Sequence, residues 1–242
     1  MTDTKNIALV TGANKGIGLE ICRQLAGLGF TVLLGSREIS RGMEAARKLQ
    51  EEGLEVRAVH VDLNDPDTFG KLQDLIAADY GRLDVLVNNA GYASDWAYNA
   101  ATVPMQMMRD TFETNFFGTV ELTQCLLPLI RKSAAGRIVN QSSIRGSLTL
   151  HSTPDSGMGE MNPLAYDSSK TALNAFTIHL ANALKATPIK VNSAHPGPAA
   201  TDANPAGTMS IEDGARTAVR LATLPPDGPT GGFFHMDQTL PW

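Results

Sequence analysis

Two side chains four residues apart, Tyr166 and Lys170, could carry out proton transfer. On the helical pattern of residues 164–187, positions four apart share one face, so the ammonium group should lie beside the phenol. A free phenol loses its proton near pH ~10, and a neighbouring positive charge lowers that pKa because it stabilises the phenolate. Tyr166 could therefore give a proton to an alkoxide or take one back.

Two other polar residues, Ser143 and Asn115, could complete such a site. Ser143 follows an apolar run at 137–141, and a hydroxyl at a strand end could donate a hydrogen bond to a carbonyl oxygen as negative charge develops on it. Asn115 lies within a predicted helix. Taken singly, a double serine is usually a turn and a helix asparagine usually serves local hydrogen bonding. The catalytic interpretation therefore depends on the set being assembled in one place.

A glycine-rich turn at residues 11–18 (TGANKGIG) follows the first predicted strand and precedes an apolar helical pattern. Gly12, Gly16 and Gly18 permit a tight turn and a close approach of the backbone to a phosphate. The N-terminus of the following helix presents free N–H groups and a positive dipole to the same anion. Such glycines can also form a turn alone, but the position at the first strand-to-helix turn favours a pyrophosphate site.

The residues after the second predicted strand indicate which dinucleotide binds. NAD sites usually place an acid there for the ribose 2′-hydroxyl, whereas this chain has Arg37. Arg37 and Lys15 could both pair with a 2′-phosphate, which favours NADP(H). The alternative is that Arg37 is a solvated surface charge, and the neighbouring Glu38 weakens the positive field. Asp62 could accept from the adenine amino group or could simply be an acid at a helix entry.

The elements that must position these residues alternate between apolar strand-like runs and helical patterns. That alternation predicts an α/β fold, a doubly wound sheet of seven parallel strands with helices on both faces. Residues 1–242 are predicted to form a single domain. The predicted strands are 7–11, 31–35, 56–61, 83–88, 137–141, 189–194 and 232–235.

Local signals predict two helix starts and two loops. Asn64 can cap a helix whose first turn holds a proline and two acids, and Ser210 with Asp213 predicts a capping box for a helix over 211–224. The stretches 148–163 and 196–208 are rich in small residues and proline, which predicts loops. Both follow predicted strands, so they should emerge at the carboxyl edge of the sheet, where ligands bind in open α/β folds.

Composition and charge exclude several classes of protein. The chain is 43% apolar and 19% charged with a net charge of -5, and its Lys and Arg residues are scattered, so no nucleic acid partner is expected. No apolar run reaches transmembrane length, and the N-terminus lacks the pattern of a signal peptide. We therefore expect no membrane partner and a cytoplasmic location. Cys22 and Cys125 have no CxxC or His neighbours, and no metal site is predicted.

Taken together, these motifs resemble the short-chain dehydrogenase/reductase family over the whole chain. The glycine spacing, Asp62, Asn88-Asn89-Ala90-Gly91, Asn115, the double serine, Tyr166-x-x-x-Lys170 and Pro196-Gly197 with Thr201 occur in the family's order. The stretch 228–234 and the final Pro241-Trp242 resemble the carbonyl reductase branch. The resemblance implies a Rossmann fold and an oxidoreductase, an NADPH-dependent carbonyl reductase or ketoreductase. Such an enzyme transfers hydride reversibly between NADP(H) and a small-molecule alcohol or carbonyl substrate.

The resemblance also implies roles for single residues. Ser143 matches the family's serine better than Ser142 does. Lys170 would bind the nicotinamide ribose, and Asn115 would help to hold a water in a proton relay. His195 is interpreted as a strand-end residue of the nicotinamide loop rather than as a base. The implied cofactor contacts are Gly12, Asn14, Lys15, Gly16, Ile17, Gly18, Arg37, Asp62, Leu63, Asn88, Ala90, Gly91, Tyr166, Lys170, Pro196, Gly197 and Thr201, with Asn88 and Gly91 closest to the adenosine ribose and partly structural.

Three loops, residues 92–103, 144–163 and 196–210, are predicted to line the substrate site. The interval of 23 positions from Ser143 to Tyr166 is longer than is usual in the family and shorter than the insertion of animal carbonyl reductases. Apolar and methionine side chains suit small to medium apolar ketones or aldehydes, although they could instead pack the loops together. The residues concerned are Tyr92, Ala93, Trp96, Leu148, His151, Met158 and Met161.

Other functions remain open at this stage. A non-catalytic NADP-binding regulatory protein of the same fold would keep the cofactor site, but such relatives have usually lost part of the tyrosine, lysine and serine set that this chain retains. An epimerase or dehydratase of the extended branch would need another glycine spacing and a C-terminal substrate domain. A homo-oligomer is expected through the helices that carry Asn115 and Tyr166, unless the insertion before Tyr166 blocks that packing.

Overall fold

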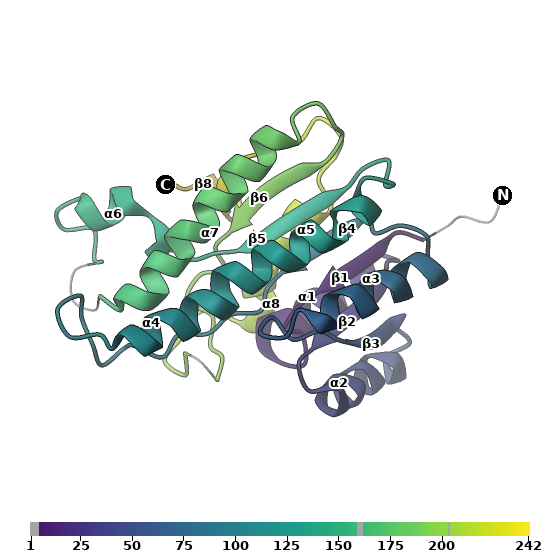
Figure 1. Cartoon of the computed structure of the whole chain (residues 1–242), viewed down its shortest axis with the longest axis horizontal. Helices are drawn as coiled ribbons and strands as arrows, with labels where there is room; N and C mark the ends of the chain where they lie inside the picture. Colours follow the sequence, from purple (N-terminus) through teal and green to yellow (C-terminus); the bar gives the residue numbers. More distant parts are fainter. Residues whose placement is uncertain (1–4, 159–161, 203) are drawn as a thin grey trace.

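The protein is built around one sheet. The computed structural model describes residues 5–158, 162–202 and 204–242, and Figure 1 shows the sheet running through the middle of this part of the chain. The strand order is β3-β2-β1-β4-β5-β6-β7-β8. The strands are β1 (Ile7–Val10), β2 (Thr31–Ser36), β3 (Val56–His60), β4 (Val85–Asn88), β5 (Arg137–Gln141), β6 (Lys190–Ala194), β7 (Phe233–His235) and β8 (Gln238–Thr239).

The seven predicted parallel strands are confirmed, with ends within two residues of the predicted ones. Strand β1 lies between β2 and β4, so the strand order reverses there, and open α/β sheets bind ligands at the carboxyl side of such a reversal. The short strand β8 was not predicted. It pairs antiparallel with β7 across a turn in which Met236 has a φ of 50°. Both of its residues are exposed, so no apolar pattern marked it.

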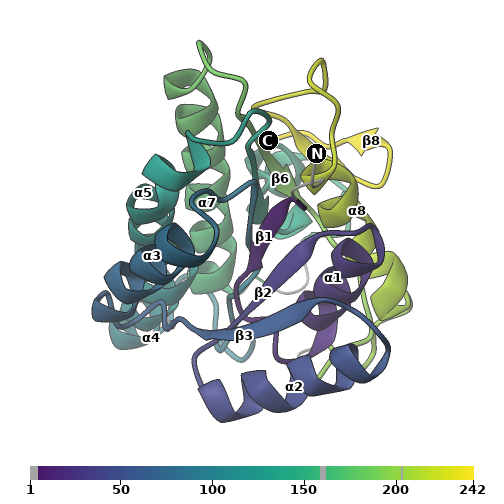
Figure 2. The same ribbon diagram turned by 90° about the vertical axis from the view of Figure 1, so that its right-hand side faces the viewer.

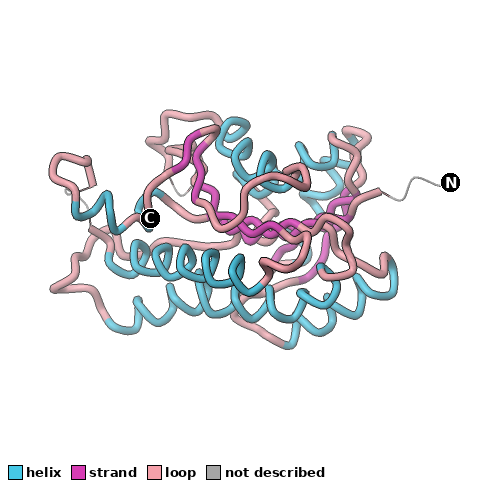
Figure 3. Tube along the Cα trace, turned by 90° about the horizontal axis from the view of Figure 1, so that it is seen from above, coloured by secondary structure: helices cyan, strands magenta, loops and turns pink. Residues whose placement is uncertain are grey.

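Helices cover both faces of the sheet, as predicted. Figure 2 shows α1, α2 and α8 on one face and α3, α4, α5 and α7 on the other, and Figure 3 shows helices on both sides of the strands. The helices are α1 (Gly16–Gly27), α2 (Ile39–Glu51), α3 (Asp67–Asp79), α4 (Met105–Phe112), α5 (Gly118–Ile130), α6 (Leu148–Ser152), α7 (Leu164–Ala183) and α8 (Ile211–Ala222), with a π-helical turn η1 (Glu113–Phe117) and a 3-10 turn η2 (Ile144–Gly146).

The core consists of two apolar layers, one on each side of the sheet. In β1, Ala8 and Val10 face the layer under α1, α2 and α8. Their neighbours Ile7 and Leu9 face the layer under α3, α5 and α7. All four are buried. Because successive strand residues point to opposite faces, a strand covered on both sides must be apolar throughout, which is why the central strands read as continuous apolar runs.

Local predictions at the helix ends gave mixed results. The N-cap half of the predicted capping box is confirmed, since Ser210 Oγ accepts from the Asp213 N–H at 3.0 Å. The predicted Asn64 cap is wrong: α3 begins only at Asp67, and Asn64 Oδ1 instead accepts from the Thr114 hydroxyl at 3.0 Å. The predicted loop after β5 contains α6, because Ser147 caps that short helix through the Leu150 N–H.

Candidate active site

Three of the four predicted catalytic side chains meet where β5 ends and α7 begins. Ser143 follows β5, Tyr166 lies in the first turn of α7, and their side chains are hydrogen-bonded to each other. Lys170 lies one turn further along α7, with its Nζ atom 5.7 Å from the centroid of the Tyr166 ring. Lys170 Nζ also donates to the Gln141 carbonyl oxygen at 2.8 Å, which anchors the ammonium to the end of β5.

The contact with Tyr166 distinguishes Ser143 from Ser142. The hydroxyl of Ser143 also accepts from the Arg145 N–H at 3.2 Å, so the 3-10 turn after β5 fixes its position. The Ser142 hydroxyl is buried and has no hydrogen-bond partner among the described residues. The structure therefore places Ser143, the serine chosen from the sequence pattern, beside the phenol.

Burial controls the electrostatics of the pair. It raises the pKa of Tyr166 above its usual value, and the hydrogen bond to Ser143 opposes that shift only in part. Burial lowers the pKa of Lys170 to about 8. A lowered phenol pKa is expected when the positive charge of the oxidised nicotinamide adds to that of Lys170, so it remains a prediction for the complex with cofactor. A raised pKa keeps Tyr166 protonated at neutral pH, as a proton donor requires.

Asn115 lies in η1, the π-helical turn between α4 and α5, and it is 1% exposed. Its side-chain amide forms two bonds with the backbone of Tyr92, donating to the carbonyl at 2.9 Å and accepting from the N–H at 2.9 Å. It also donates to the Ser169 hydroxyl at 3.0 Å. The amide thus joins the segment after β4 to α7, and its implied part in a proton relay remains a prediction.

Gly91 gives the candidate catalytic group its close packing. A Cβ atom at this position would lie 3.1 Å from Asn115 Oδ1 and 3.3 Å from Lys170 Nζ. Gly91 therefore lies directly against two of the predicted residues, and a larger side chain would displace one of them.

The glycine turn after β1 has the shape of a phosphate cradle. A Cβ atom at Gly12 would lie 2.8 Å from Ala90 Cα, and one at Gly18 would lie 2.5 Å from Asn89 Nδ2, so both glycines are packed against the segment after β4. At Gly16 (φ 58°) the nearest atom is Thr201 Cγ2 at 4.0 Å, which leaves this side open. Helix α1 begins here without a side-chain cap, so its first N–H groups are available to an anion. These residues fit a dinucleotide pyrophosphate.

Asn89 is a structural residue of this site that the sequence analysis did not single out. Its amide donates to the carbonyl oxygens of Thr11 at 2.9 Å and Gly12 at 3.3 Å. The Thr11 hydroxyl in turn accepts from the N–H groups of Asn89 and Ala90, both at 3.0 Å. Asn89 thus fixes the glycine turn to β4, and its only sequence signal was its place between two residues already assigned to the cofactor.

The side chain of Asn88 is buried between α5 and the sheet. It is 3% exposed, and its amide donates to the Thr123 hydroxyl at 2.9 Å and to Asn140 Oδ1 at 2.8 Å. Asn140 continues the chain of bonds to the Thr177 hydroxyl at 2.8 Å. The side chain of Asn88 therefore joins α5 to β5, which agrees with its partly structural interpretation.

At the end of β2, Arg37 is exposed and Glu38 is paired with Arg41 at 2.9 Å. Arg41 therefore offsets the negative charge of Glu38, which would otherwise disfavour a phosphate at Arg37. Lys15 has a partner that was not predicted, because its Nζ atom lies 2.7 Å from Asp202 in the 196–210 loop. The ion pair spans the gap between the glycine turn and that loop.

The remaining predicted cofactor contacts lie around the same edge of the sheet. Asp62 Oδ1 accepts from the Asn64 N–H at 3.0 Å, as an Asx turn does. The Leu63 backbone packs closely against Gly118 at the start of α5. A Cβ atom added to Gly118 would lie 2.0 Å from the Leu63 carbonyl oxygen. Gly197 has a φ of 80° and a Cβ there would meet His235 at 2.8 Å. Four further predicted cofactor contacts are half-buried at this edge: Asn14, Ile17, Pro196 and Thr201.

His195 joins the end of β6 to the turn that carries Ser143. Its Nδ1 atom accepts from the Ile144 N–H at 3.3 Å, and its ring centroid lies 5.0 Å from that of His235. Burial, with a smaller effect of His235, lowers the pKa of His195 to about 4. The ring is therefore neutral at working pH and its Nδ1 atom is occupied, which agrees with a positioning rather than a basic role.

The predicted substrate loop 92–103 places the aromatic side chain of Trp96 next to Tyr166. The Trp96 ring lies 5.7 Å from the Tyr166 ring and is 43% exposed. Arg145 covers Trp96 at 5.8 Å and binds Asp167 through two hydrogen bonds of 2.7 and 3.0 Å. His151 lies 3.4 Å from the same carboxylate.

The methionines of these loops do not all line a cleft. Met158 is 8% exposed, so it packs the loop rather than facing a substrate, and Leu148 is exposed. Met161 lies outside the described residues. For Met158, the packing alternative raised by the sequence is the better description.

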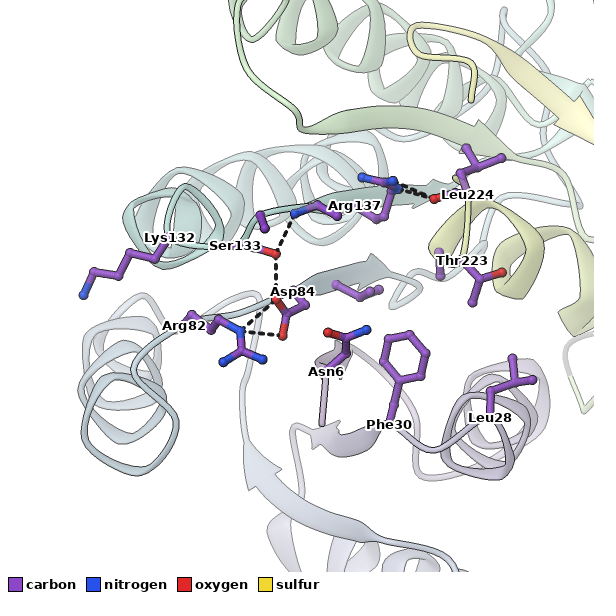
Figure 4. Close-up of a pocket in the computed structure, with 14 residues that line it drawn as sticks. Asn6, Leu28, Phe30, Arg82, Asp84, Lys132, Ser133, Arg137, Thr223 and Leu224 are labelled. Atoms are coloured by element: carbon purple, nitrogen blue, oxygen red, sulfur yellow. Dashed lines mark hydrogen bonds and ion pairs between the residues drawn. The ribbon is translucent and has the colours of Figure 1, made fainter. Parts of the chain in front are cut away.

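A cavity of about 710 Å³ lies at the opposite, amino-terminal edge of the sheet (Figure 4). Three of its charged side chains, Arg82, Asp84 and Arg137, are bonded within the protein. The Arg137 guanidinium donates to the Leu224 carbonyl oxygen at 2.6 and 3.0 Å. The Asp84 carboxylate binds Arg82 at 3.0 Å and the Ser133 hydroxyl at 2.6 Å. The cavity is remote from Tyr166, and its internal bonds support the structure of this edge.

Fold and site together define an α/β protein of the dinucleotide-binding kind, with the candidate catalytic group at the carboxyl edge of its sheet. A model of the family described as short chain dehydrogenase matches residues 6–209. The chain belongs to this family and is an oxidoreductase of the short-chain dehydrogenase kind. Within the described residues, no helix is long and apolar enough to cross a membrane.

Similar proteins include reductases from animals and plants. The chain is 36% identical to NADPH carbonyl reductase 1 of Mus musculus over 285 residues, which cover 100% of both chains. It is 35% identical to salutaridine reductase of Papaver bracteatum, with 96% of this chain and 94% of the relative covered. The structure of salutaridine reductase from Papaver somniferum superposes with a TM-score of 0.83 at 30% identity, covering 97% of this chain and 100% of that one. Menthone neomenthol reductase from Mentha piperita gives a TM-score of 0.79 at 31% identity over the same shares.

Proposed function

We propose that this protein reduces small to medium apolar ketones or aldehydes to alcohols with NADPH. The observation that carries the proposal is the assembly of Tyr166, Ser143 and Lys170 at the carboxyl edge of the sheet. The similarity to reductases of animals and plants supports it. Members of such a family with different substrates would share this group, so the substrate class rests on the loops around it.

The cofactor would bind across the carboxyl ends of β1, β2 and β4. The open side of Gly16 and the uncapped start of α1 would take the pyrophosphate. Arg37 would take the 2′-phosphate, with Lys15 as the second cation, and Asp62 would take the adenine amino group. Lys170 and the 196–210 loop would hold the nicotinamide end. When bound, NADPH supplies the hydride for the reaction.

The chain's own residues would orient the substrate and move the proton. The hydroxyls of Ser143 and Tyr166 are hydrogen-bonded to each other, so both can turn toward one carbonyl oxygen placed against them. They stabilise the negative charge that develops on that oxygen. Tyr166, which burial keeps protonated, gives its proton to the alkoxide. The ammonium of Lys170, with a pKa of about 8, is charged at neutral pH and stabilises the phenolate that remains.

The surroundings of Tyr166 favour an apolar substrate. The Trp96 ring packs against Tyr166 and is 43% exposed, so it offers flat apolar surface to a substrate bound beside Tyr166. Arg145, whose guanidinium lies 5.8 Å from the Trp96 ring, is bonded to Asp167. A phosphorylated or carrier-bound substrate would need a more basic entrance. Oligomeric state and cytoplasmic location remain predictions.

The direct test is NADPH consumption by the purified protein with a panel of apolar ketones, aldehydes and quinones, repeated with NADH. Tyr166→Phe removes the proton donor, so kcat should fall by about 10²- to 10⁴-fold while NADPH still binds. Tyr80→Phe is the matched control, because Tyr80 bonds to Arg57 beyond the end of α3, and it should retain full activity. Tight NADPH binding without turnover on any substrate would favour a regulatory protein and contradict the proposal.

A further inference from the structure

A carboxylate from the 92–103 loop is buried at the start of the helix that carries Tyr166. Asp95 is 0% exposed. One of its oxygens accepts from the Ala165 N–H at 2.7 Å and the other accepts from the Tyr166 N–H at 3.4 Å. The two bonds connect residues that lie about seventy positions apart in the sequence.

These bonds replace a cap that α7 lacks in its own sequence. The helix begins at Leu164, and the preceding Pro163 offers no side-chain acceptor. The first N–H groups of a helix have no partners within the helix, and a buried N–H left unpaired is costly. A carboxylate is a favourable partner because the helix dipole is positive at this end. Asp95 therefore caps α7 from a distant segment of the chain.

The same loop contacts the phenol itself. The ring of Trp96, the next residue, packs against the ring of Tyr166 at 5.7 Å and an interplanar angle of 41°. The start of the loop is held by the two bonds between Asn115 and the Tyr92 backbone. The loop is thus attached at Tyr92 and again at Asp95. Because Trp96 directly follows Asp95, the same attachment holds its ring against Tyr166.

We propose that Asp95 is a positioning residue for Tyr166, which holds the first turn of α7 and the Trp96 ring so that the phenol hydroxyl points to Ser143. The proposal rests on the function proposed above. Asp95 touches the backbone of Tyr166 rather than its hydroxyl, so it acts through that residue.

The position of Tyr166 makes it sensitive to this cap. It lies in the first turn of α7, and the first turn of a helix frays when its N–H groups lose their partners. Its hydroxyl is hydrogen-bonded to Ser143, and Lys170 Nζ lies 5.7 Å from the centroid of its ring. The ion pair of Arg145 and Asp167 is close enough for both charges to act on the phenol. A displacement of about 1 Å in a catalytic group can lower the rate about 10²-fold. Loss of the cap should therefore reduce turnover more than it reduces binding.

The experiment compares Asp95→Ala and Asp95→Asn with the wild type. Alanine removes both acceptors, so kcat should fall about 10- to 100-fold, with the Kd for NADPH changed less than about twofold. Asparagine keeps one acceptor oxygen and caps helices about as well as aspartate, so kcat should recover to within about fivefold of wild type. If the alanine variant does not fold, the asparagine variant still tests the proposal through a change confined to kcat.

Asp84→Asn is the matched control. Asp84 is also a buried carboxylate that accepts from a backbone N–H, that of Ile7 at 2.8 Å, but it lies at the opposite edge of the sheet (Figure 4). It should lower the melting temperature while kcat at 25 °C stays within about twofold of wild type. An equal loss of kcat in Asp84→Asn and Asp95→Ala would mean that stability alone explains the effect and would overturn the proposal.

Amide hydrogen exchange separates this inference from the proposed function. In Asp95→Ala the N–H groups of Ala165 and Tyr166 should exchange at least about tenfold faster, while those in the middle of α7 should not change. This readout needs no substrate, so it applies even if the wild type reduces nothing on the panel. Unchanged exchange at these two positions would overturn the capping by Asp95, whatever the turnover.

Discussion

At the residue scale, burial decides how Tyr166 and Lys170 behave. Burial disfavours the charged form of each, so it raises the pKa of the phenol and lowers that of the ammonium. The phenol is then a protonated donor, and the lysine titrates within reach of ordinary assay conditions. The residue types and their spacing could be read from the sequence, but the direction of the phenol pKa could not, because it depends on the surrounding packing.

The pH dependence of reduction should follow Lys170. Reduction needs Tyr166 protonated and Lys170 charged, so kcat/KM should be level below pH 7 and fall as the pH rises through about 8, the pKa of Lys170. Lys170→Arg keeps a positive charge that does not titrate in this range, so in this variant the fall near pH 8 should disappear even though kcat is lower. A fall at the same pH in both proteins would show that another group controls it.

Cofactor preference should follow Arg37. Arg37→Asp replaces a cation with the acid that favours a ribose 2′-hydroxyl, so the Kd for NADPH should rise about 10- to 100-fold while that for NADH changes little or improves. Arg47→Ala is the control, since Arg47 pairs with Glu51 on the exposed side of α2. Fluorescence titration of both cofactors measures the ratio, and an unchanged preference in Arg37→Asp would remove this residue from 2′-phosphate recognition.

At the element scale, the sequence was most informative where burial imposes a pattern. Strands covered on both faces must be apolar throughout, and the seven parallel strands were predicted for that reason. The elements it missed have little burial: β8 has two exposed residues, and α6 has five with none buried. The cap of α7 by Asp95 was also missed, because a contact across seventy positions leaves no local signal.

The start of α5 should be intolerant of a side chain at its first residue. A Cβ at Gly118 would lie 2.0 Å from the Leu63 carbonyl oxygen, so Gly118→Ala must displace the backbone after Asp62, where the adenine is proposed to bind. We expect a loss of about 1–3 kcal/mol in the free energy of unfolding and weaker NADPH binding, measured by urea denaturation and by titration.

Gly70 provides the comparison for that substitution. It lies within α3 and a Cβ there would meet nothing within 4 Å. Because glycine costs a helix about 0.5–1 kcal/mol relative to alanine, Gly70→Ala should stabilise the protein and leave NADPH binding unchanged. If both variants were stabilised equally, the close approach between α5 and Leu63 would not hold in solution.

At the scale of the whole molecule, polar contacts link the segments that carry the candidate site across the fold. Asn115 joins the segment after β4 to α7, and Asn89 joins the same segment to the glycine turn. His195 joins β6 to the turn after β5. Each bond connects elements far apart in the chain, so the sequence motifs could indicate which residues belong to the site but not which of them hold the others in place.

The ion pair between Lys15 and Asp202 joins the glycine turn to the 196–210 loop and should compete with the cofactor. Lys15 is proposed to bind the 2′-phosphate, but its ammonium lies 2.7 Å from Asp202 and both side chains are exposed. Because exposed pairs are weak, Asp202→Asn should free Lys15 at little cost and tighten NADPH binding about two- to fivefold. NADH binding should not change, since NADH has no phosphate at that position. In a Lys15→Ala background the same substitution should have no effect on the Kd for NADPH, and an equal effect there would show that Asp202 acts on the cofactor without Lys15.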